Sequence, residues 1–581
     1  MMRIYRSDTI EVSKDQNLTE LLHSSAYPDL PESHLIAKDS LTNRSITIGK
    51  LRERAARIAK GIQTKCNPPD QARWAIILPN SVDFLEAVHA ILWTGGIFCP
   101  INHALRAAEI GHGLAVSRPH FVVVYGVVLP TVEEALQVAR KELADRGVSW
   151  ARPRLMTVVS RAKELPHFPD DFIAEDRLLV PHWSDTATRV ASIHLSSGTT
   201  GKPKGVELTH RNFVANCHQL LAHDRTQFHP RSRMVAFTPW AHIGMTTLPL
   251  FLGPYAGMLH HAMPRYELSE FLRLVASDQA TSFQGVPSVL QQLADPAHDD
   301  LVARHSDLSR SQFINVGGPL PADLERRLLR RAPWRLVQVY GMTEAAGYVA
   351  YQHTADPPAP RGVTGRLLPG VEACLRTTGG GTDAPEGGPG ELWLRGPNIA
   401  RRYAFDEEAN ARAFGLPMAR GEERGRESEE GTQGWYNTGD VCTIDGAGRV
   451  SVVGRTKELI KYKGFQVSPS ELEALAGTHP AVEAVGAGAT WDERGLTELP
   501  TAWVVLRGGL AEAPEVERRT TLRAVQRHVD TQVSGYKKLR GGVWEVHALP
   551  RNATGKVLRQ EMAAMRDGLC SLDPEPRKAM L

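Results

Sequence analysis

A short segment rich in glycine, hydroxyl and lysine side chains constrains the fold of this chain more than any other feature. Residues 196–205 read Ser-Ser-Gly-Thr-Thr-Gly-Lys-Pro-Lys-Gly. Glycines let a backbone approach a phosphate group closely, and hydroxyl and ammonium groups complete an anion site. Residues 190–195 and 204–208 alternate as strands do, so we predict a β-hairpin whose tip binds the phosphates of a nucleotide.

This segment differs from the phosphate loop of many nucleoside triphosphatases. Pro203 follows Lys202 where that loop requires Ser or Thr before a helix. Thr209 is the predicted N-cap of a helix after the hairpin, because Phe213 and Cys217 begin an apolar face at helical spacing. The alternative, a flexible connector, does not account for the two lysines inside such a frame.

Length and composition indicate a soluble enzyme with several cores. A chain of 581 residues exceeds the size of about 250–300 residues at which single cores stop growing. Its hydrophobic content is 42%, its charged content 23% and its net charge +3, without a run of Lys and Arg, so we expect no nucleic-acid partner. Pro249, Gly253 and Pro254 interrupt the longest apolar stretch, 244–259, so we expect no membrane insertion.

The cysteines and the two ends of the chain bear on its compartment. The six cysteines have no paired spacing, which predicts buried thiols rather than disulfides or zinc ligands. A cytoplasmic location follows, since the first residues have no apolar signal core. The C-terminal Ala579-Met580-Leu581 loosely resembles a peroxisomal address and leaves that location open.

Alternating helix-like and strand-like segments predict the domain organisation. Residues 45–125 and 235–339 alternate as helix-covered parallel sheets do, whereas glycine-punctuated short strands after residue 365 predict a β-rich subdomain. We therefore predict an α/β chain with a large multi-subdomain N-terminal body and a small mobile α+β C-terminal domain. The predicted boundaries are 1–455 and 456–567, followed by a flexible tail, 568–581; residues 419–433 should form a solvated surface insertion.

Seven further segments follow the predicted phosphate loop in the order found in the adenylate-forming (ANL) superfamily, which the chain resembles over roughly residues 45–565. They are Pro-Trp-Ala-His-Ile-Gly at 239–244, Asn-Val-Gly-Gly-Pro-Leu at 315–320, Tyr-Gly-Met-Thr-Glu at 340–344, Gly-Glu-Leu at 390–392, Tyr-Asn-Thr-Gly-Asp at 436–440, Gly-Arg-Thr-Lys-Glu-Leu-Ile-Lys at 454–461 and Asn-Ala-Thr-Gly-Lys at 552–556. Residues 461–467 are most similar to the acyl- and aryl-CoA synthetase branch that includes 4-coumarate:CoA ligase and firefly luciferase.

The resemblance implies an ATP-dependent acid:CoA ligase, that is, an AMP-forming acid–thiol ligase. Such an enzyme joins an aryl or acyl carboxylic acid to AMP with release of pyrophosphate, and then forms an acyl-CoA thioester, using ATP, Mg²⁺ and coenzyme A. One alternative is transfer of the acyl group to an amine, an alcohol or a carrier-protein thiol. Another is a luciferase-like oxygenase or a nucleotide-binding regulator on the same fold. The acid, the pathway and the oligomeric state stay open.

The resemblance also implies the residues of the nucleotide site. Tyr340 would offer a ring face to adenine, Asp440 and Arg455 would bind the ribose, Thr343 the phosphates and Glu344 the Mg²⁺. The predicted nucleotide-binding set is Ser196, Ser197, Gly198, Thr199, Thr200, Gly201, Lys204, Gly317, Gly318, Pro319, Tyr340, Gly341, Met342, Thr343, Asp440 and Arg455.

Three further roles come from the same resemblance. Lys556 would stabilise the charge that shifts between the acid and the α-phosphate, and the predicted catalytic set is Lys556, His242, Thr343 and Glu344. Lys457 would be the hinge of a domain rotation that exchanges the adenylation and thioester-forming states. After that rotation, Lys461, Lys463 and Gly464 would line the site for coenzyme A.

The predicted acid pocket contains Ala241, His242, Gly244 and Val339. Relatives carry an aromatic residue at the position of Gly244, so its absence suggests extra room, while Val339 replaces a glycine and narrows another wall. Together these residues predict a bulky or branched aryl or acyl acid.

Overall fold

A seven-stranded and a fourteen-stranded sheet form the large N-terminal part of the computed structural model. The structure describes residues 2–572 apart from 163, 197–202, 286, 305–310, 317–319, 321, 332–334, 357–361, 378–381, 416–433, 457, 464, 493–496 and 552–556. The helices of the N-terminal part are α1 (Leu18–His23), α2 (Ile48–Cys66), α3 (Val82–Trp93), α4 (Ala107–Ser117), α5 (Leu129–Asp145), α6 (His210–His223), α7 (Ile243–Thr246), α8 (Gly253–Ala256), α9 (Leu268–Ser277), α10 (Pro287–Leu293), α11 (Asp299–Arg304), α12 (Ala322–Arg331) and α13 (Glu407–Ala413).

The seven-stranded sheet contains the predicted hairpin. Its order is β19-β9-β8-β5-β4-β6-β7, with strands β4 (Arg73–Ile77), β5 (Ile97–Pro100), β6 (Phe121–Tyr125), β7 (Arg154–Val158), β8 (Val190–Ser196), β9 (Lys204–Thr209) and β19 (Arg402–Tyr403). The pairs from β7 to β8 are parallel, as the alternating sequence predicts, and β8 pairs antiparallel with β9 from Val190 to Ser196. Thr209 caps α6, because its hydroxyl accepts a hydrogen bond from the Asn212 amide at 3.2 Å.

The fourteen-stranded sheet joins a parallel half to an antiparallel half. The parallel half contains β2 (Leu35–Asp39), β10 (Arg233–Ala236), β11 (Leu259–Ala262), β12 (Ser282–Gly285), β13 (Gln312–Asn315) and β14 (Arg335–Met342), and β3 (Ser45–Thr47) pairs antiparallel at its edge. The antiparallel half contains β1 (Tyr5–Arg6), β15 (Gly347–Tyr351), β16 (Val363–Leu367), β17 (Glu372–Arg376), β18 (Gly390–Arg395), β20 (Tyr436–Ile444) and β21 (Arg449–Arg455). It corresponds to the predicted β-rich subdomain.

One strand, β14, belongs to both halves. Its residues 335–338 pair parallel with β13, and its residues 339–342 pair antiparallel with β15. The register shifts between Tyr340 and Gly341. A β-bulge of this kind bends a strand and redirects its side chains, so the motif at 340–344 lies where the two halves meet.

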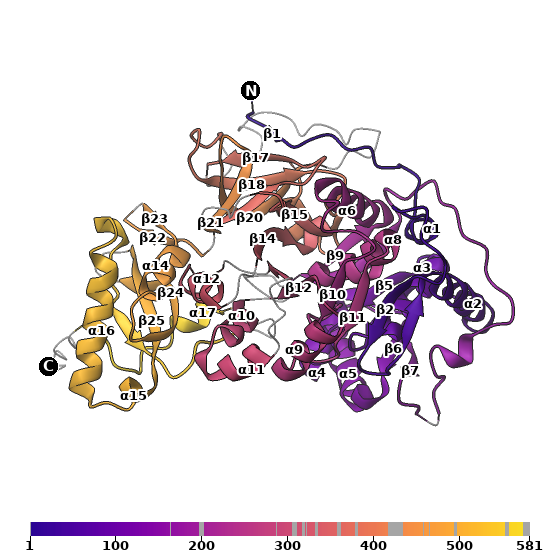
Figure 1. Ribbon diagram of the computed structural model, residues 1–581, viewed down its shortest axis with the longest axis horizontal. Helices are drawn as coiled ribbons and strands as arrows, with labels where there is room; N and C mark the ends of the chain where they lie inside the picture. The colour runs from indigo at the N-terminus through magenta and orange to yellow at the C-terminus, as the bar shows by residue number, and fades with distance from the viewer. Residues whose placement is uncertain are drawn as a thin grey trace.

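The C-terminal part has a core of its own. Its elements are β22 (Ile460–Tyr462), β23 (Phe465–Val467), α14 (Pro469–Ala476), β24 (Val482–Asp492), β25 (Thr497–Leu506), α15 (Gly508–Ala511), α16 (Glu515–Asp530), β26 (Val543–Glu545) and α17 (Arg559–Met562). Leu472, Ala502, Leu522 and Val543 lie in one buried cluster. Figure 1 shows α14, α16, β24 and β25 gathered at one end of the molecule, opposite the end that carries β6 and β7.

The end of the described chain is more ordered than the sequence suggests. Residues 568–581 are predicted as a flexible tail, but the amide of Ser571 donates to the carbonyl of Val543 at 2.9 Å, and that of Glu545 donates to Leu569 at 2.8 Å. Cys570 is buried beside Trp544. The packed part of the C-terminal domain therefore reaches residue 572, because this segment pairs with the free edge of β26.

The cysteine side chains are buried, as predicted. All six thiols are free and buried. None of the helices in the described ranges combines the length and apolarity that crossing a bilayer requires.

Candidate nucleotide and acid site

The hairpin brings two predicted phosphate-binding residues together. Ser196 ends β8 and Lys204 begins β9, and the Lys204 amide donates a hydrogen bond to the Ser196 hydroxyl at 3.4 Å. Ser197, Gly198, Thr199, Thr200 and Gly201, the remaining predicted residues of this loop, lie outside the described residues.

A tyrosine that the sequence analysis does not single out connects this hairpin to the predicted metal ligand. Tyr403 lies on β19, opposite Val206 of β9. Lys204 Nζ lies 4.8 Å from the centre of the Tyr403 ring, within the range of a cation–π contact. The Tyr403 hydroxyl donates a 2.8 Å hydrogen bond to Glu344 Oε1 and lies 3.3 Å from the Tyr436 hydroxyl. No local pattern marks Tyr403, because it reaches the site through strand pairing across almost 200 residues.

Glu344 is a buried carboxylate next to a second polar cluster. It lies in a single 3₁₀ turn, Thr343–Ala345, directly after β14, and is 8% exposed. Burial raises the pKa of Glu344 above its ordinary value, while the hydrogen bond from Tyr403 acts to lower it. Arg455 also acts to lower the pKa of Glu344, so the guanidinium and this carboxylate belong to one electrostatic site.

Tyr340, Asp440 and Arg455 form that second cluster. The Tyr340 hydroxyl donates to Asp440 Oδ2 at 2.5 Å, and Arg455 Nε pairs with Asp440 Oδ1 at 3.0 Å. The pairing of β20 with β21 sets Asp440 opposite Arg455. Burial and the Asp440 carboxylate raise the pKa of Tyr340 well above its ordinary value, which keeps its hydroxyl protonated as a donor. The Tyr340 hydroxyl and the Arg455 guanidinium thus contact different oxygens of the Asp440 carboxylate.

Gly341 is required by a close approach of two backbones. A Cβ atom at Gly341 would lie 1.8 Å from the carbonyl oxygen of Gly347, on the neighbouring strand β15. Only glycine fits at this position of the bulge. The next residue, Met342, packs partly buried against the main core.

His242 begins the short helix α7. Its Nδ1 accepts a hydrogen bond from the amide of Gly244 at 3.3 Å, as an N-cap does. Burial lowers the pKa of His242, so its imidazole is neutral near neutral pH. Burial lowers the pKa of neighbouring His194 from 6.5 to about 3, and its Nε2 atom lies 2.9 Å from the Thr246 hydroxyl.

The space beside Gly244 is bounded by two polar side chains that the sequence analysis does not identify. Gln284 Nε2 donates to the Gly244 carbonyl at 3.0 Å, and the Tyr348 hydroxyl donates to the same oxygen at 2.5 Å. A Cβ atom at Gly244 would lie 3.2 Å from Gln284 Nε2 and 3.7 Å from Val316 Cγ2. The predicted extra room is therefore partly taken up by Gln284. Val339 is buried on β14, and Ala241 is half-buried.

Several predicted residues lie outside the described residues: Gly317, Gly318, Pro319, Lys457, Gly464 and Lys556. The chain on both sides of Lys556 is described, and Arg551 and Val557 form an antiparallel bridge. Arg559, just beyond, pairs with Glu458 at 3.0 Å and also with Glu473. Lys461 and Lys463 are exposed on and next to β22.

The carboxylate chemistry of the site suits a magnesium ion. Within the described ranges, no three His, Cys, Asp or Glu residues gather closely enough to hold a metal ion by themselves. Mg²⁺ is commonly bound through one or two carboxylates together with substrate phosphates. Glu344, buried and linked through Tyr403 to Lys204, fits that requirement.

Comparison with known proteins gives matches along most of the chain. Residues 26–404 match the family model described as AMP-binding enzyme, and residues 471–556 match that of the AMP-binding enzyme C-terminal domain. A 4-coumarate–CoA ligase-like protein of Oryza sativa subsp. japonica is 30% identical over 534 residues, which cover 90% of this chain and 89% of that protein. A peroxisomal OPC-8:0-CoA ligase of Arabidopsis thaliana is 29% identical over 492 residues, covering 84% and 82%.

The fold also matches solved structures. The o-succinylbenzoate coenzyme A synthetase of Bacillus subtilis, in complex with ATP and magnesium ion, gives a TM-score of 0.72 at 21% identity. The match covers 94% of this chain and 99% of that one.

Proposed function

The chain belongs to the AMP-binding enzyme family, and we propose that it activates a carboxylic acid with ATP and Mg²⁺ and transfers the acyl group to coenzyme A. An oxygen of the acid attacks the α-phosphorus of ATP, the bond to the β-phosphate breaks, and pyrophosphate leaves. The thiol sulfur of coenzyme A, having lost its proton, then attacks the acyl carbonyl, and AMP leaves. The protein is accordingly an AMP-forming acid–CoA ligase.

One observation carries the proposal: Tyr403 contacts both Lys204 and Glu344. Tyr403 thereby lies between Lys204, the proposed cation for the leaving phosphates, and Glu344, the proposed ligand of their magnesium ion. In the first step negative charge grows on the leaving pyrophosphate, and preorganised cations stabilise such charge without reorganising. Glu344 would hold Mg²⁺, which would supply further positive charge to stabilise the leaving pyrophosphate.

The remaining predicted residues would position the nucleotide and the acid, and serve the transfer of the acyl group to coenzyme A. We propose that Asp440 and Arg455 hold the ribose, and that the adenine lies against Tyr340 and residues 317–319. His242 and Val339 would contact the acid, with Gln284 limiting its width beside Gly244. Lys556 would serve adenylation, and rotation about Lys457 would bring Lys461, Lys463 and Gly464 to coenzyme A. A bulky aryl or acyl acid fits these contacts.

The test is a screen of carboxylic acids with ATP, Mg²⁺ and coenzyme A, read by pyrophosphate release and by acyl-CoA mass. We expect pyrophosphate release to need an acid, and acyl-CoA to need coenzyme A as well. Glu344→Gln should abolish both signals, whereas Glu372→Gln, which changes a carboxylate paired with Arg395 away from the site, should keep them. Pyrophosphate release without acyl-CoA would favour an amine, alcohol or carrier-protein acceptor, and no release at all would contradict adenylation.

We propose a cytoplasmic location. The peroxisome is the alternative, because one relative is a peroxisomal ligase. A fluorescent protein fused to the N-terminus should stay diffuse whether or not residues 579–581 are present. Punctate signal that depends on these three residues would establish the peroxisomal alternative.

A further inference from the structure

A polar cavity of about 380 Å³ lies at the carboxyl ends of the neighbouring parallel strands β2 and β11. None of its lining residues belongs to the nucleotide and acid site described above. They are Lys38, Asp39, Ser40, Asn43, Arg44, Ser45, His261, Glu270 and Arg273. In open α/β sheets, ligands bind outside the carboxyl ends of the strands. The side chains that line this cavity are therefore candidates for binding or catalysis.

Ser40, His261 and Asp278 form a continuous chain of contacts at this cavity. Ser40 Oγ lies 3.2 Å from His261 Nε2, and His261 Nδ1 lies 2.5 Å from Asp278 Oδ2. With the proton on Nδ1 donated to the carboxylate, Nε2 accepts the hydrogen bond from the serine hydroxyl. This order of groups activates a serine as a nucleophile: the carboxylate orients the imidazole, and the imidazole removes the hydroxyl proton.

The surrounding structure fixes the geometry of the three residues. Strand register places His261 opposite Lys38, and Ser40, two residues further on, lies on the same side of the sheet. Asp278 follows α9, and its other carboxylate oxygen pairs with Lys38 Nζ at 3.2 Å. The His261 and Asp278 side chains are nearly buried, whereas Ser40 is half-buried and faces the cavity. Ser40, the nucleophile, is thus the most accessible of the three residues.

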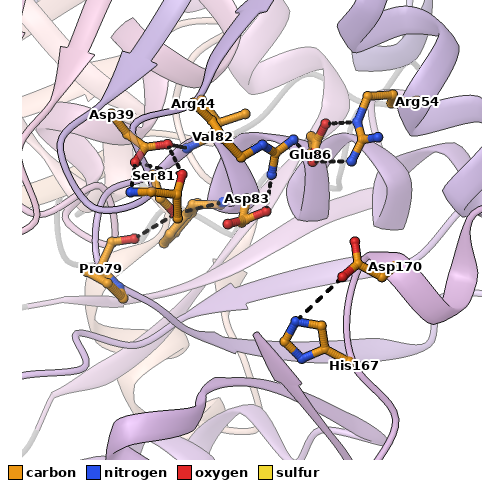
Figure 2. A network of polar contacts seen from close by, with 12 residues as sticks. Asp39, Arg44, Arg54, Pro79, Ser81, Val82, Asp83, Glu86, His167 and Asp170 are labelled. Carbon is orange, nitrogen blue, oxygen red and sulfur yellow. Dashed lines mark hydrogen bonds and ion pairs between the residues drawn. The ribbon is translucent and has the colours of Figure 1, made fainter. Parts of the chain in front are cut away.

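The charges around the cavity select an uncharged substrate. Arg44 is held between Asp83 and Glu86 (Figure 2), with its Nη2 atom 2.9 Å from Glu86 Oε2. Arg273 pairs with Glu270 at 2.6 Å. Because each of these cations has a carboxylate partner, as Lys38 has in Asp278, the cavity offers little net positive charge to attract an anion.

Asp39 does not act as a competing base. Its carboxylate accepts a hydrogen bond from the backbone amide of Val82 at 3.0 Å (Figure 2). It also accepts one from the backbone amide of Thr42 at 2.5 Å, so its role is to hold the loop after β2. That loop carries Asn43, whose side-chain amide supplies N–H donors at the cavity wall.

We propose that Ser40, His261 and Asp278 hydrolyse neutral carboxylic esters without ATP. Ser40 Oγ adds to the ester carbonyl while its proton passes to His261 Nε2, and the Asn43 amide stabilises the resulting oxyanion. The carbon–oxygen bond to the alcohol then breaks, and the alcohol leaves with the proton from Nε2. A water oxygen then attacks the acyl carbon while its proton passes to His261 Nε2. The bond from the acyl carbon to Ser40 Oγ breaks, Nε2 returns the proton to Oγ, and the acid leaves.

The test uses the full-length protein without ATP or Mg²⁺, with p-nitrophenyl butyrate as the ester and a fluorophosphonate as the covalent probe. We expect hydrolysis, and peptide mapping should place the label on Ser40. Ser40→Ala should lose the label and at least about 100-fold of the hydrolysis rate, as removal of a triad member does. The control Ser45→Ala removes a hydroxyl from the same cavity and should keep both signals.

The labelling of the unmodified protein needs no variant, so it stays decisive if a substitution harms folding. Ligase activity and melting temperature should be unchanged in Ser40→Ala, which separates this activity from adenylation. The proposal is overturned if the probe does not label Ser40, or if Ser40→Ala hydrolyses the ester at the rate of the unmodified protein. Inhibition of hydrolysis by ATP and Mg²⁺ would instead assign it to the nucleotide site.

Discussion

The hydroxyl of Tyr403 donates a 2.8 Å hydrogen bond to Oε1 of Glu344, and the ring of the same tyrosine lies beneath the ammonium group of Lys204. Pairing of β19 with β9 brings this tyrosine to the hairpin. A residue outside the predicted site therefore positions two residues inside it.

Tyr403→Phe should weaken the magnesium site while keeping the ring beneath Lys204. Loss of the hydroxyl leaves Glu344 with a buried acceptor that has lost its donor, a cost of about 1–3 kcal/mol. It also removes an interaction that lowers the pKa of Glu344. We expect roughly tenfold slower pyrophosphate exchange and a higher Mg²⁺ requirement. The acid limb of the pH–rate profile should move to higher pH, because the pKa of Glu344 rises. The control Tyr27→Phe removes a hydroxyl bound to the Phe228 carbonyl, away from the site. Unchanged Mg²⁺ dependence in Tyr403→Phe would contradict the positioning role.

Lys556→Ala should leave ATP binding nearly intact and slow adenylation by at least about 100-fold, because it removes a charge that acts in the transition state. Calorimetry measures the first quantity and acid-dependent pyrophosphate exchange the second. Lys50→Ala, at an exposed position of α2, is the control. Exchange at the rate of the unmodified protein would remove Lys556 from the catalytic set.

Lys457→Pro should separate the two half-reactions. A proline restricts φ at the position proposed as the hinge, so adenylate formation should persist while thioester formation falls. Single-turnover assays that follow acyl-AMP and acyl-CoA separately test this expectation. Equal loss of both half-reactions would argue against a hinge at this residue.

Gly341→Ala should disturb the junction of β14 and β15. The added methyl group would overlap the Gly347 carbonyl, and relief of that overlap must displace Tyr340 or the neighbouring strand. We expect a destabilisation of about 1–3 kcal/mol together with weaker AMP binding. Gly446→Ala places its methyl group in open space and should have little effect. Melting temperatures and AMP titrations compare the two variants, and equal behaviour would show that the strands yield easily.

Acidification should destabilise the fold through its buried histidines. Burial lowers the pKa of His89 to about 4, below the ordinary value of 6.5. The contribution of neutral His89 to the free energy of unfolding is fully present above pH 6.5. It is lost as pH falls towards 4, because the unfolded chain then binds a proton that the folded chain does not. The loss is up to about 1.4 kcal/mol per pH unit. His89→Gln should flatten the decline of melting temperature between pH 6.5 and 5, whereas exposed His547→Gln should not. A parallel decline in both variants would exclude His89 as a source.

Local patterns predict local structure well in this chain. The hairpin from Val190 to Thr209 and the Thr209 cap follow from alternation and capping chemistry, and both are present. Helix α16 begins at Glu515, directly after Pro514, but its buried side chains begin only at Leu522, so apolar periodicity alone does not reveal its first turns.

Contacts between distant segments are what the sequence does not disclose. Gln284 and Tyr348 meet at the Gly244 carbonyl from separate strands, and Tyr403 reaches Glu344 across 59 residues. Ser40 and His261 are 221 residues apart. Each encounter depends on strand order and register, for which a single sequence contains no periodic signal.

The dual membership of β14 limits how this protein can be recombined with its relatives. Gln338 and Val339 are consecutive residues, yet one aligns with β13 and the other with β15. In a chimera joined between them, each parent sheet would contain half of a foreign strand, with mismatched side chains next to the register shift at Tyr340 and Gly341. Exchanges of the β-rich subdomain are therefore expected to yield folded hybrids only when β14 is inherited whole from one parent.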